Sequence, residues 1–421
     1  MHDIKDNKPE RAILVAVRTG ETTREVLQEH IDELELLVKT AGAETIFKIV
    51  QDRQRYDTAY FIGKGKAEEL ANLVELNEIN LIIFDDDLTA TQVRNLENLI
   101  NKKIIDRSAL ILDIFASHAR TNEAKTQVEF AQLQYMMTRL TRAWTHLSKQ
   151  YGGIGTKGPG ETQIETDRRI IRTRISKLKE RLKKIESEHI TTSAKRKEFL
   201  KASLVGYTNA GKSTILNLLT GAGVLAEDKL FATLDSTTRA LELEKNKKIL
   251  ISDTVGFIRK LPHNLVASFK TTLNVVREAD IILHVIDITN DYFEDHIKVV
   301  DDTLKELYDE KKIVIHIFNK VDALIEKSRI DYVLHKYEKS IVISAERGIN
   351  VSALKVYLVK IYEDNFNQRT ITLDIHESKK VSLIHKYAEV IKTAYGDEKV
   401  TIIFRANPEN ANKILRLINE K

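Results

Sequence analysis

The first part of the chain alternates short apolar runs with amphipathic stretches. The run AILVAV at residues 12–17 predicts a buried strand, and the stretch from Arg24 to Gly42 repeats apolar residues at helical spacing and stops at a glycine. Such alternation builds a parallel sheet covered by helices, so we assign an α/β domain to residues 1–119. Within it, further strands are expected at 45–50, 80–87 and 102–108, and further helices at 67–78, 89–100 and 109–119.

A long antiparallel helical hairpin is predicted next, over residues 120–197. Residues 121–149 and 163–188 carry apolar residues at helical spacing, which in the second stretch are three, four or seven positions apart, as in a seam between two helices. Between them, the segment YGGIGTKGPGE at residues 151–161 contains five glycines and a proline. The chain must therefore turn there.

The strand–helix rhythm returns over residues 198–365 and predicts a doubly wound sheet. The remaining residues, 366–421, read as strand, helix, strand and helix, and the segment SLIHKYAEVIKTAY at 382–395 is expected to be one helix. The expected fold class is therefore α/β: an N-terminal α/β domain, a helical hairpin, a doubly wound domain and a small α+β C-terminal domain.

Composition narrows the class of protein. The 421 residues are 42% hydrophobic and 30% charged, as in ordinary soluble proteins, and no apolar run reaches the roughly 18 residues of a membrane span. The first residues are polar, so we expect a cytoplasmic protein, monomeric, with peripheral association at a membrane left open. The absence of cysteine excludes disulfides, zinc–thiolate sites and thiol chemistry.

Positive charge is concentrated in one segment. The net charge is only +4, yet residues 168–201 contain thirteen basic residues against four glutamates. An excess of this size predicts a polyanionic partner such as RNA, and a solvated helix face packed on its own protein is the alternative.

A phosphate-binding loop is predicted at Gly206–Ser213, which has the spacing G-x-x-x-x-G-K-S between an apolar strand and a helix. Glycines allow successive N–H groups to point at phosphate oxygens, and the helix N-terminus adds its positive end. Lys212 would supply charge to the outer phosphates, and the Ser213 hydroxyl would bind Mg²⁺. The nucleotide is expected to contact the whole loop: Gly206, Tyr207, Thr208, Asn209, Ala210, Gly211, Lys212 and Ser213.

Three further motifs follow in order, each at the end of a predicted strand. In D-x-x-G, Asp253 can reach Mg²⁺ through water and the Gly256 N–H can meet the γ-phosphate, with Thr254 and Val255 between them. In N-K-x-D, the Asp322 carboxylate matches the two donors of guanine and leaves adenine unmatched. Asn319 can bridge base and loop, the Lys320 stem can cover the base, and Val321 lies between them. In the last motif, the backbone of Ser344 and Ala345, followed by Glu346, can donate to guanine O6. Together the motifs predict GTP.

Two features of catalysis stay open from spacing alone. A switch threonine should close over the γ-phosphate and Mg²⁺, and Thr233, Thr237 and Thr238 are all candidates. The position after D-x-x-G, where many GTPases have a glutamine that orients water, holds Phe257, so we expect slow hydrolysis that a large partner accelerates. Asn209 is a candidate ligand for K⁺ beside the phosphates, with stabilisation of the loop turn as the alternative.

The chain resembles the HflX family of GTPases over essentially its whole length. The stretches that carry the resemblance are GGIGTKGPGETQIETDRR, GYTNAGKST, LFATLDSTTR, DTVGFIRKLP and NKVD, with Ser236 standing where the family commonly has proline. The resemblance implies that Thr233 is the switch residue that contacts Mg²⁺. It also implies that the nucleotide contacts the segment around it, Phe231, Ala232, Thr233, Leu234 and Asp235, and that Lys212, Thr233 and Gly256 serve catalysis.

The resemblance also implies a partner and an activity. It implies binding to the large (50S) ribosomal subunit and its rRNA and to 70S ribosomes, and GTP-dependent splitting of stalled ribosomes. The basic hairpin is then a candidate wedge against rRNA. The alternatives from other classes are a regulatory switch that recruits a protein effector, and a GTPase that assists ribosome assembly.

Overall fold

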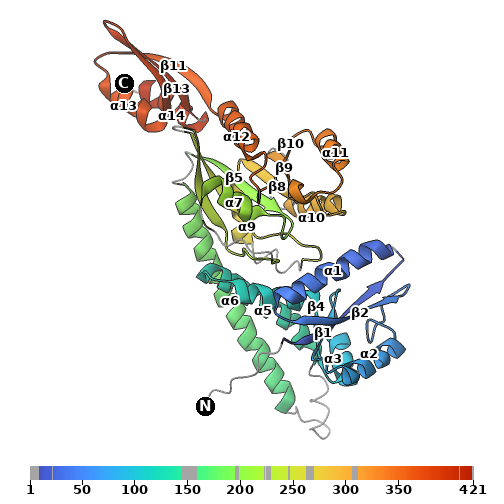
Figure 1. Cartoon of the computed structure of the whole chain (residues 1–421). Helices are drawn as coiled ribbons and strands as arrows, with labels where there is room; N and C mark the ends of the chain where they lie inside the picture. Colours follow the sequence, from blue (N-terminus) through green and yellow to red (C-terminus); the bar gives the residue numbers. More distant parts are fainter. Residues whose placement is uncertain are drawn as a thin grey trace, which may run out of the picture. The chain divides into compact units, whose positions relative to one another are not determined.

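The structure, a computed structural model, describes residues 9–20, 22–143, 159–194, 199–221, 223, 229–244, 247–261, 270–305, 312–406 and 408–419. Most of the predicted glycine-rich turn at 151–161 lies outside these residues. The chain divides into two compact units (Figure 1). One contains residues 1–186 with 226–235 and 255–273, and the other contains residues 187–225, 236–254 and 274–421.

The first unit contains a four-stranded parallel sheet in the order β2-β1-β3-β4. The sequence periodicity predicts these strands, the three helices between them and a fourth helix after the last strand: β1 (Arg11–Arg18), α1 (Arg24–Thr40), β2 (Glu44–Asp52), α2 (Lys64–Leu76), β3 (Leu81–Phe84), α3 (Ala90–Ile100), β4 (Lys103–Asp106) and α4 (Arg107–His118). Alternate residues of β1, Ile13, Val15 and Val17, pack with apolar residues of α2 and α3 in one continuous core. The predicted α/β domain is confirmed.

The hairpin consists of α5 (Asn122–Ala143) and α6 (Pro159–Ala194), and α6 belongs to the first unit up to residue 186. α5 packs on α3 and α4, and it buries Ala124, Val128 and Ala131. The α6 helix buries Leu178, and its Arg174 pairs with Glu129 of α5 at 2.7 Å. The predicted helical hairpin is confirmed, and α6 is longer at both ends than its apolar spacing predicts.

The second unit is built on a six-stranded sheet in the order β10-β9-β8-β5-β7-β6, parallel except for β6. Its strands are β5 (Leu200–Gly206), β6 (Thr237–Glu244), β7 (Lys247–Asp253), β8 (Ile281–Asp287), β9 (Ile313–Asn319) and β10 (Ser340–Val342). The connecting helices include α7 (Lys212–Thr220), α9 (Lys270–Glu278), α10 (Phe293–Lys305), α11 (Ser328–Lys336) and α12 (Val351–Asn365). This confirms the predicted doubly wound sheet, and the carboxyl ends of β5, β7 and β9 carry three of the predicted motifs.

The C-terminal part of the second unit differs from its prediction. It has β11 (Asn367–Asp374), α13 (Ser378–Tyr387), β12 (Glu389–Tyr395), β13 (Lys399–Ala406) and α14 (Pro408–Asn419), with an antiparallel sheet ordered β11-β13-β12. The single helix expected at 382–395 is wrong, because its second half is the strand β12. Val390, Ile391, Thr393 and Tyr395 favour a strand, and β12 pairs with β13 on both sides of a register shift at Ile391.

One carboxylate joins the C-terminal sheet to the larger sheet. Glu363 on α12 accepts from Lys247 of β7 at 2.6 Å and from Arg405 of β13 at 3.4 Å. Among the described residues, no helix is long and apolar enough to cross a membrane.

Candidate nucleotide-binding site

The predicted phosphate loop joins β5 to α7 through two glycines that have no room for a side chain. A Cβ on Gly206 would lie 2.2 Å from the carbonyl oxygen of Val285, and a Cβ on Gly211 would lie 2.2 Å from Nδ2 of Asn319. Gly211 also has a φ of +95°, a left-handed conformation that strains other residues. Any other residue at either position would push the loop away from β8 and β9.

Lys212 is the first residue of α7 and is almost completely buried. Its Nζ donates to the carbonyl oxygens of Gly206 at 3.2 Å and Tyr207 at 2.8 Å, so the ammonium lies back over the loop. Burial lowers its pKa to about 8. A charge held over a ring of backbone groups is what a lysine needs to neutralise phosphate oxygens.

The Ser213 hydroxyl and the Asp253 carboxylate meet at the ends of α7 and β7. The hydroxyl donates to Oδ2 of Asp253 at 2.6 Å, and the neighbouring Thr254 hydroxyl ties the end of β7 to Leu204 of β5 at 2.8 Å. Two oxygen donors at this spacing suit a hard cation such as Mg²⁺ that takes further ligands from phosphate and water. Among the described residues, no cluster of three or more metal-binding side chains could hold an ion by itself.

The other predicted loop residues differ in their surroundings. Thr208 is buried, and its hydroxyl has no hydrogen-bond partner among the described residues. Asn209 is exposed and has a φ of +60°, a conformation that asparagine tolerates better than most residues. Ala210 is buried, and its carbonyl accepts from Nδ2 of Asn319 at 2.9 Å.

The base-recognition motifs meet through Asn319, the last residue of β9. While Nδ2 of Asn319 holds the phosphate loop, its Oδ1 accepts from the Ala345 N–H at 2.9 Å. One side chain thus joins the phosphate loop, N-K-x-D and the Ser344–Ala345 segment. The N–H groups expected to reach guanine O6 bind protein oxygens here, because Ser344 donates to Ile349 at 3.1 Å. Glu346 is exposed beside them.

Two partners of the N-K-x-D residues were missed by the sequence reasoning. Asp322 lies 3.4 Å from Nε of Arg347, and the Ser344 hydroxyl together with Arg347 lowers the pKa of Asp322, so it stays an ionised acceptor. Lys320, with a φ of +66°, pairs with Asp287 at 2.7 Å, and Val321 donates to Ile343 at 3.2 Å. The position of Asp287 at the end of a predicted strand was the signal available for it.

A third missed residue is His296 on α10. Its ring stacks on that of Tyr207, with centroids 3.7 Å apart and planes within 4°. Tyr207 belongs to the phosphate loop and is buried. The helical spacing of α10 gives no indication that His296 would face this loop.

The remaining predicted residues lie in the first compact unit. In the segment from Phe231 to Asp235, Phe231 and Leu234 are buried and Ala232 and Thr233 are half-buried. Val255, Gly256 and Phe257 are buried. Thr237 and Thr238 belong instead to β6, where the Thr238 hydroxyl lies 2.8 Å from that of Ser252.

Comparison with known families defines the class of protein. Residues 201–320 match the family described as 50S ribosome-binding GTPase, residues 28–116 match GTP-binding GTPase N-terminal, and residues 118–196 match GTP-binding GTPase Middle Region. Together with the loop around Lys212, these matches define a P-loop GTPase, an enzyme that hydrolyses GTP.

Curated relatives then give the family. A GTPase HflX of Magnetococcus marinus is 42% identical over 95% of this chain and 93% of its own length, and that of Escherichia coli is 41% identical over 91% and 90%. The GTPase HflX of Flavobacterium psychrophilum is 50% identical over 75% of this chain and 76% of its own length. The chain belongs to the HflX family of GTPases, as the sequence resemblance implies. A GTP-binding protein of Sulfolobus solfataricus in complex with GDP is 23% identical over 84% of this chain and 99% of its own, with a TM-score of 0.46.

Proposed function

We propose that this GTPase binds the large ribosomal subunit and 70S ribosomes in the cytoplasm and, as a monomer, splits stalled ribosomes into subunits when GTP is bound. The observation that carries the proposal is the exposed basic face of α6, in a chain that also matches a ribosome-binding GTPase family.

The basic face of α6 is available to a polyanion. Six of its exposed basic side chains, among the described residues, have no carboxylate within 4 Å in a described ion pair: Arg169, Arg172, Lys177, Lys179, Arg181 and Lys183. In the described part of the hairpin, Arg174 pairs with Glu129 of α5. Arginine and lysine in such a row suit the phosphates of rRNA, and their binding should weaken steeply with salt.

The segments that should sense the γ-phosphate belong to the same compact unit as this arm. The Phe231 ring lies edge-on to Phe115 of α4 at 4.7 Å, and Asp235 accepts from the backbone of Arg120 at 3.3 Å, just before α5. After D-x-x-G, Arg259 pairs with Glu29 at 3.1 Å and Lys260 with Asp85 at 2.6 Å. These contacts support a coupling in which GTP fixes the N-terminal domain and hairpin in a ribosome-engaging arrangement.

Thr233 is our proposed switch residue, because Thr237 and Thr238 already belong to β6. With Ser213 it would hold Mg²⁺, which would neutralise charge on the β- and γ-phosphates. Phe257 is buried and cannot orient water, so hydrolysis should be slow until the ribosome supplies or positions the missing group. We retain K⁺ at Asn209 as a proposal, which replacing K⁺ by Na⁺ in a turnover assay would test.

The test is a sucrose gradient of 70S ribosomes incubated with the protein and either GDP or a non-hydrolysable GTP analogue. We expect 70S particles to disappear, and 30S and 50S to appear, with the GTP analogue only. Binding to 50S without loss of 70S would favour an assembly role. No co-sedimentation in either state would overturn the proposal and favour a switch that recruits a protein effector.

A further inference from the structure

The side chain of Lys320, the second residue of N-K-x-D, is fixed at both of its ends. Its backbone has a φ of +66°, a left-handed conformation that is strained for a residue other than glycine. Its carbonyl accepts from the Ala323 N–H at 3.1 Å, at the start of the short 3₁₀ helix η1 (Val321–Ala323). At the other end, Nζ lies 2.7 Å from Oδ2 of Asp287. The four-carbon stem between these two ends therefore has one fixed direction.

Asp287, which holds the ammonium, is the last residue of β8 and lies in register with Asn319 at the end of β9. Its two carboxylate oxygens have different partners. Oδ1 accepts from the N–H of Thr289 at 3.0 Å and from its hydroxyl at 2.6 Å, while Oδ2 faces Lys320. The bonds to Oδ1 orient the carboxylate, so Oδ2 is placed to receive the lysine.

The loop that follows β8 is held from two neighbouring elements. From β9, the Asn319 carbonyl accepts from the Ile288 N–H at 3.1 Å. From α11, Nη1 of Arg329 donates to the carbonyls of Ile288 at 3.1 Å and Asn290 at 3.4 Å. The position of Asp287 is thus set by contacts of its loop with β9 and α11, and it does not depend on the lysine that Asp287 holds.

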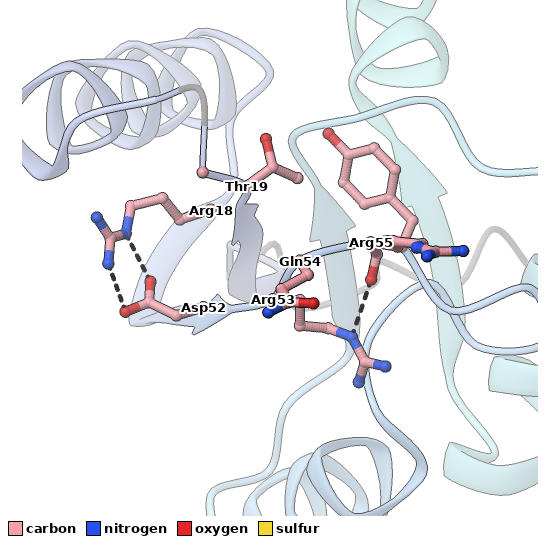
Figure 2. Close-up of a pocket in the computed structure, with 8 residues that line it drawn as sticks. Arg18, Thr19, Asp52, Arg53, Gln54 and Arg55 are labelled. Carbon is pink, nitrogen blue, oxygen red and sulfur yellow. Dashed lines mark hydrogen bonds and ion pairs between the residues drawn. The ribbon is translucent and has the colours of Figure 1, made fainter.

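Partial burial strengthens the pair between Asp287 and Lys320. Their side chains are 21% and 33% exposed, so water and salt screen the attraction only in part. A pair of the same kind lies at the ends of β1 and β2, where Asp52 holds Arg18 with two bonds of 2.7 Å and is 51% exposed (Figure 2). In both pairs, a carboxylate on the last residue of a parallel strand fixes a basic side chain from the end of the neighbouring strand. Since Asp287 is the more buried carboxylate of the two, we expect it to hold Lys320 in one conformation.

We propose that Asp287 is a positioning residue of the nucleotide site, which holds the stem of Lys320 over the face of the guanine base. A lysine stem is apolar and can cover a base while its ammonium stays paired at the edge. A mobile lysine would lose side-chain freedom when the base binds, whereas a stem that Asp287 already fixes loses little. Asp322 is held by Arg347 in a similar way, so both charged side chains of N-K-x-D are oriented by ion pairs. The proposal rests on the assignment of N-K-x-D to guanine and is independent of ribosome splitting.

The test is a calorimetric titration of the full chain with GDP. Asp287→Asn keeps an oxygen for Thr289 and removes the charge that holds Lys320, so GDP affinity should fall about three- to tenfold. Asp291→Asn is the matched control, because it neutralises a carboxylate of the same loop that pairs with Arg329 at 2.7 Å. In this control, GDP affinity should change less than about twofold, since an exposed pair contributes little. An equal loss in the two variants would overturn the proposal.

A second variant separates positioning of the lysine from a structural role in the loop. Lys320→Met keeps an apolar stem without the ammonium, so its GDP affinity should also fall about three- to tenfold. If Asp287 acts through Lys320, adding Asp287→Asn to Lys320→Met should lower GDP affinity by less than about twofold more. A carboxylate that only stabilises the loop would instead lower GDP affinity equally in both backgrounds, and that result would overturn the proposal.

Asp322→Asn distinguishes a failure of this proposal from a failure of the guanine assignment. If Asp322→Asn lowers GDP affinity and Asp287→Asn does not, Asp287 is not a positioning residue, and the assignment of N-K-x-D to guanine stands. If neither variant changes GDP affinity, the base does not lie at N-K-x-D, and the proposal and the assignment are both overturned.

Discussion

At the scale of single residues, we propose that the choice of base depends on Asp322. The Ser344 hydroxyl and the Arg347 guanidinium already hold its carboxylate ionised, so it is ready to accept from two guanine donors. Asp322→Asn places an amide against those donors and should lower GTP affinity about 100-fold, since a mismatched polar pair is left desolvated. Calorimetric titration with GTP and GDP measures the loss.

Arg347→Ala is the matched control for Asp322→Asn. Arg347 is largely exposed and touches only the outside of the carboxylate, so its removal should change GTP affinity by less than about threefold. Equal losses in the two variants would contradict the assignment of Asp322 to the base.

Lys212 is expected to make nucleotide binding depend on pH. Burial lowers its pKa in the ligand-free protein to about 8, whereas phosphate favours the charged form. Below pH 8 the ammonium is already present. Above it, GDP binding must take up a proton, so the apparent Kd should rise, approaching tenfold per pH unit. Calorimetry at pH 8.5 in two buffers of different ionisation enthalpy measures this proton uptake, and its absence would contradict the prediction.

Raising the pH should weaken nucleotide binding through Lys212, but it should increase the stability of the ligand-free protein through the same residue. Its folded pKa of about 8 lies below the ordinary value of 10.5, so the unfolded chain binds more protons between these two pH values. The free energy of unfolding of the ligand-free protein should therefore rise with pH across this window, as far as Lys212 contributes.

Sequence motifs could locate these residues but not their partners. The spacing of G-x-x-x-x-G-K-S and N-K-x-D predicts Lys212 and Asp322, because phosphate and guanine impose their own chemistry on the chain. Arg347 and Asp287 carry no such signal. Their contacts arise from the way in which neighbouring strand ends meet in space, which periodicity along the chain does not record.

At the scale of elements, the hydrophobic pattern of a segment predicts its secondary structure where that structure does not depend on pairing with a later strand. The strands β1 and β3 of the N-terminal domain are continuous apolar runs because helices cover both faces of a parallel sheet. The segment 382–395 is different, since its first half has the spacing of a helix and its second half becomes β12 only by pairing with β13. A strand that lies at the edge of its sheet and depends on a partner later in the chain is hard to predict from local pattern.

The helix α10 is expected to support the phosphate loop through His296. His296→Ala removes the ring that stacks on Tyr207, and an aromatic pair contributes about 0.5–1.5 kcal/mol, so GDP affinity should fall about two- to twelvefold. His296→Phe should restore it. His335→Ala, at an exposed histidine of α11, should have no effect, and a loss in that variant would contradict a specific role for α10.

At the scale of the whole molecule, substitutions on the basic face of α6 should affect ribosome binding without affecting GTP hydrolysis by the protein alone. Replacing Lys177, Lys179 and Arg181 on α6 by glutamate should weaken ribosome binding and reduce its dependence on log salt by about two to three units, since each phosphate contact contributes about 0.7–0.9. Turnover of GTP by the protein alone should not change. Co-sedimentation at several KCl concentrations measures the slope.

The control for the arm is a protein with the same charge change elsewhere. Glutamate at Lys102, Lys298 and Lys360, which are exposed and outside the hairpin, leaves the α6 face intact. If this variant loses ribosome binding as strongly as the α6 variant, net charge rather than the arm governs association.

The division into four domains at residues 119, 197 and 365 stays a prediction.

The Glu363 bridge gives the C-terminal sheet a mechanical route to the nucleotide. Lys247, which Glu363 holds, is the first residue of β7, and Asp253, which meets Ser213, is the last. Arg405 of β13 is therefore connected, through Glu363 and the single strand β7, to the carboxylate that meets Ser213. A partner that binds the C-terminal sheet is therefore expected to act on the nucleotide-binding site through β7.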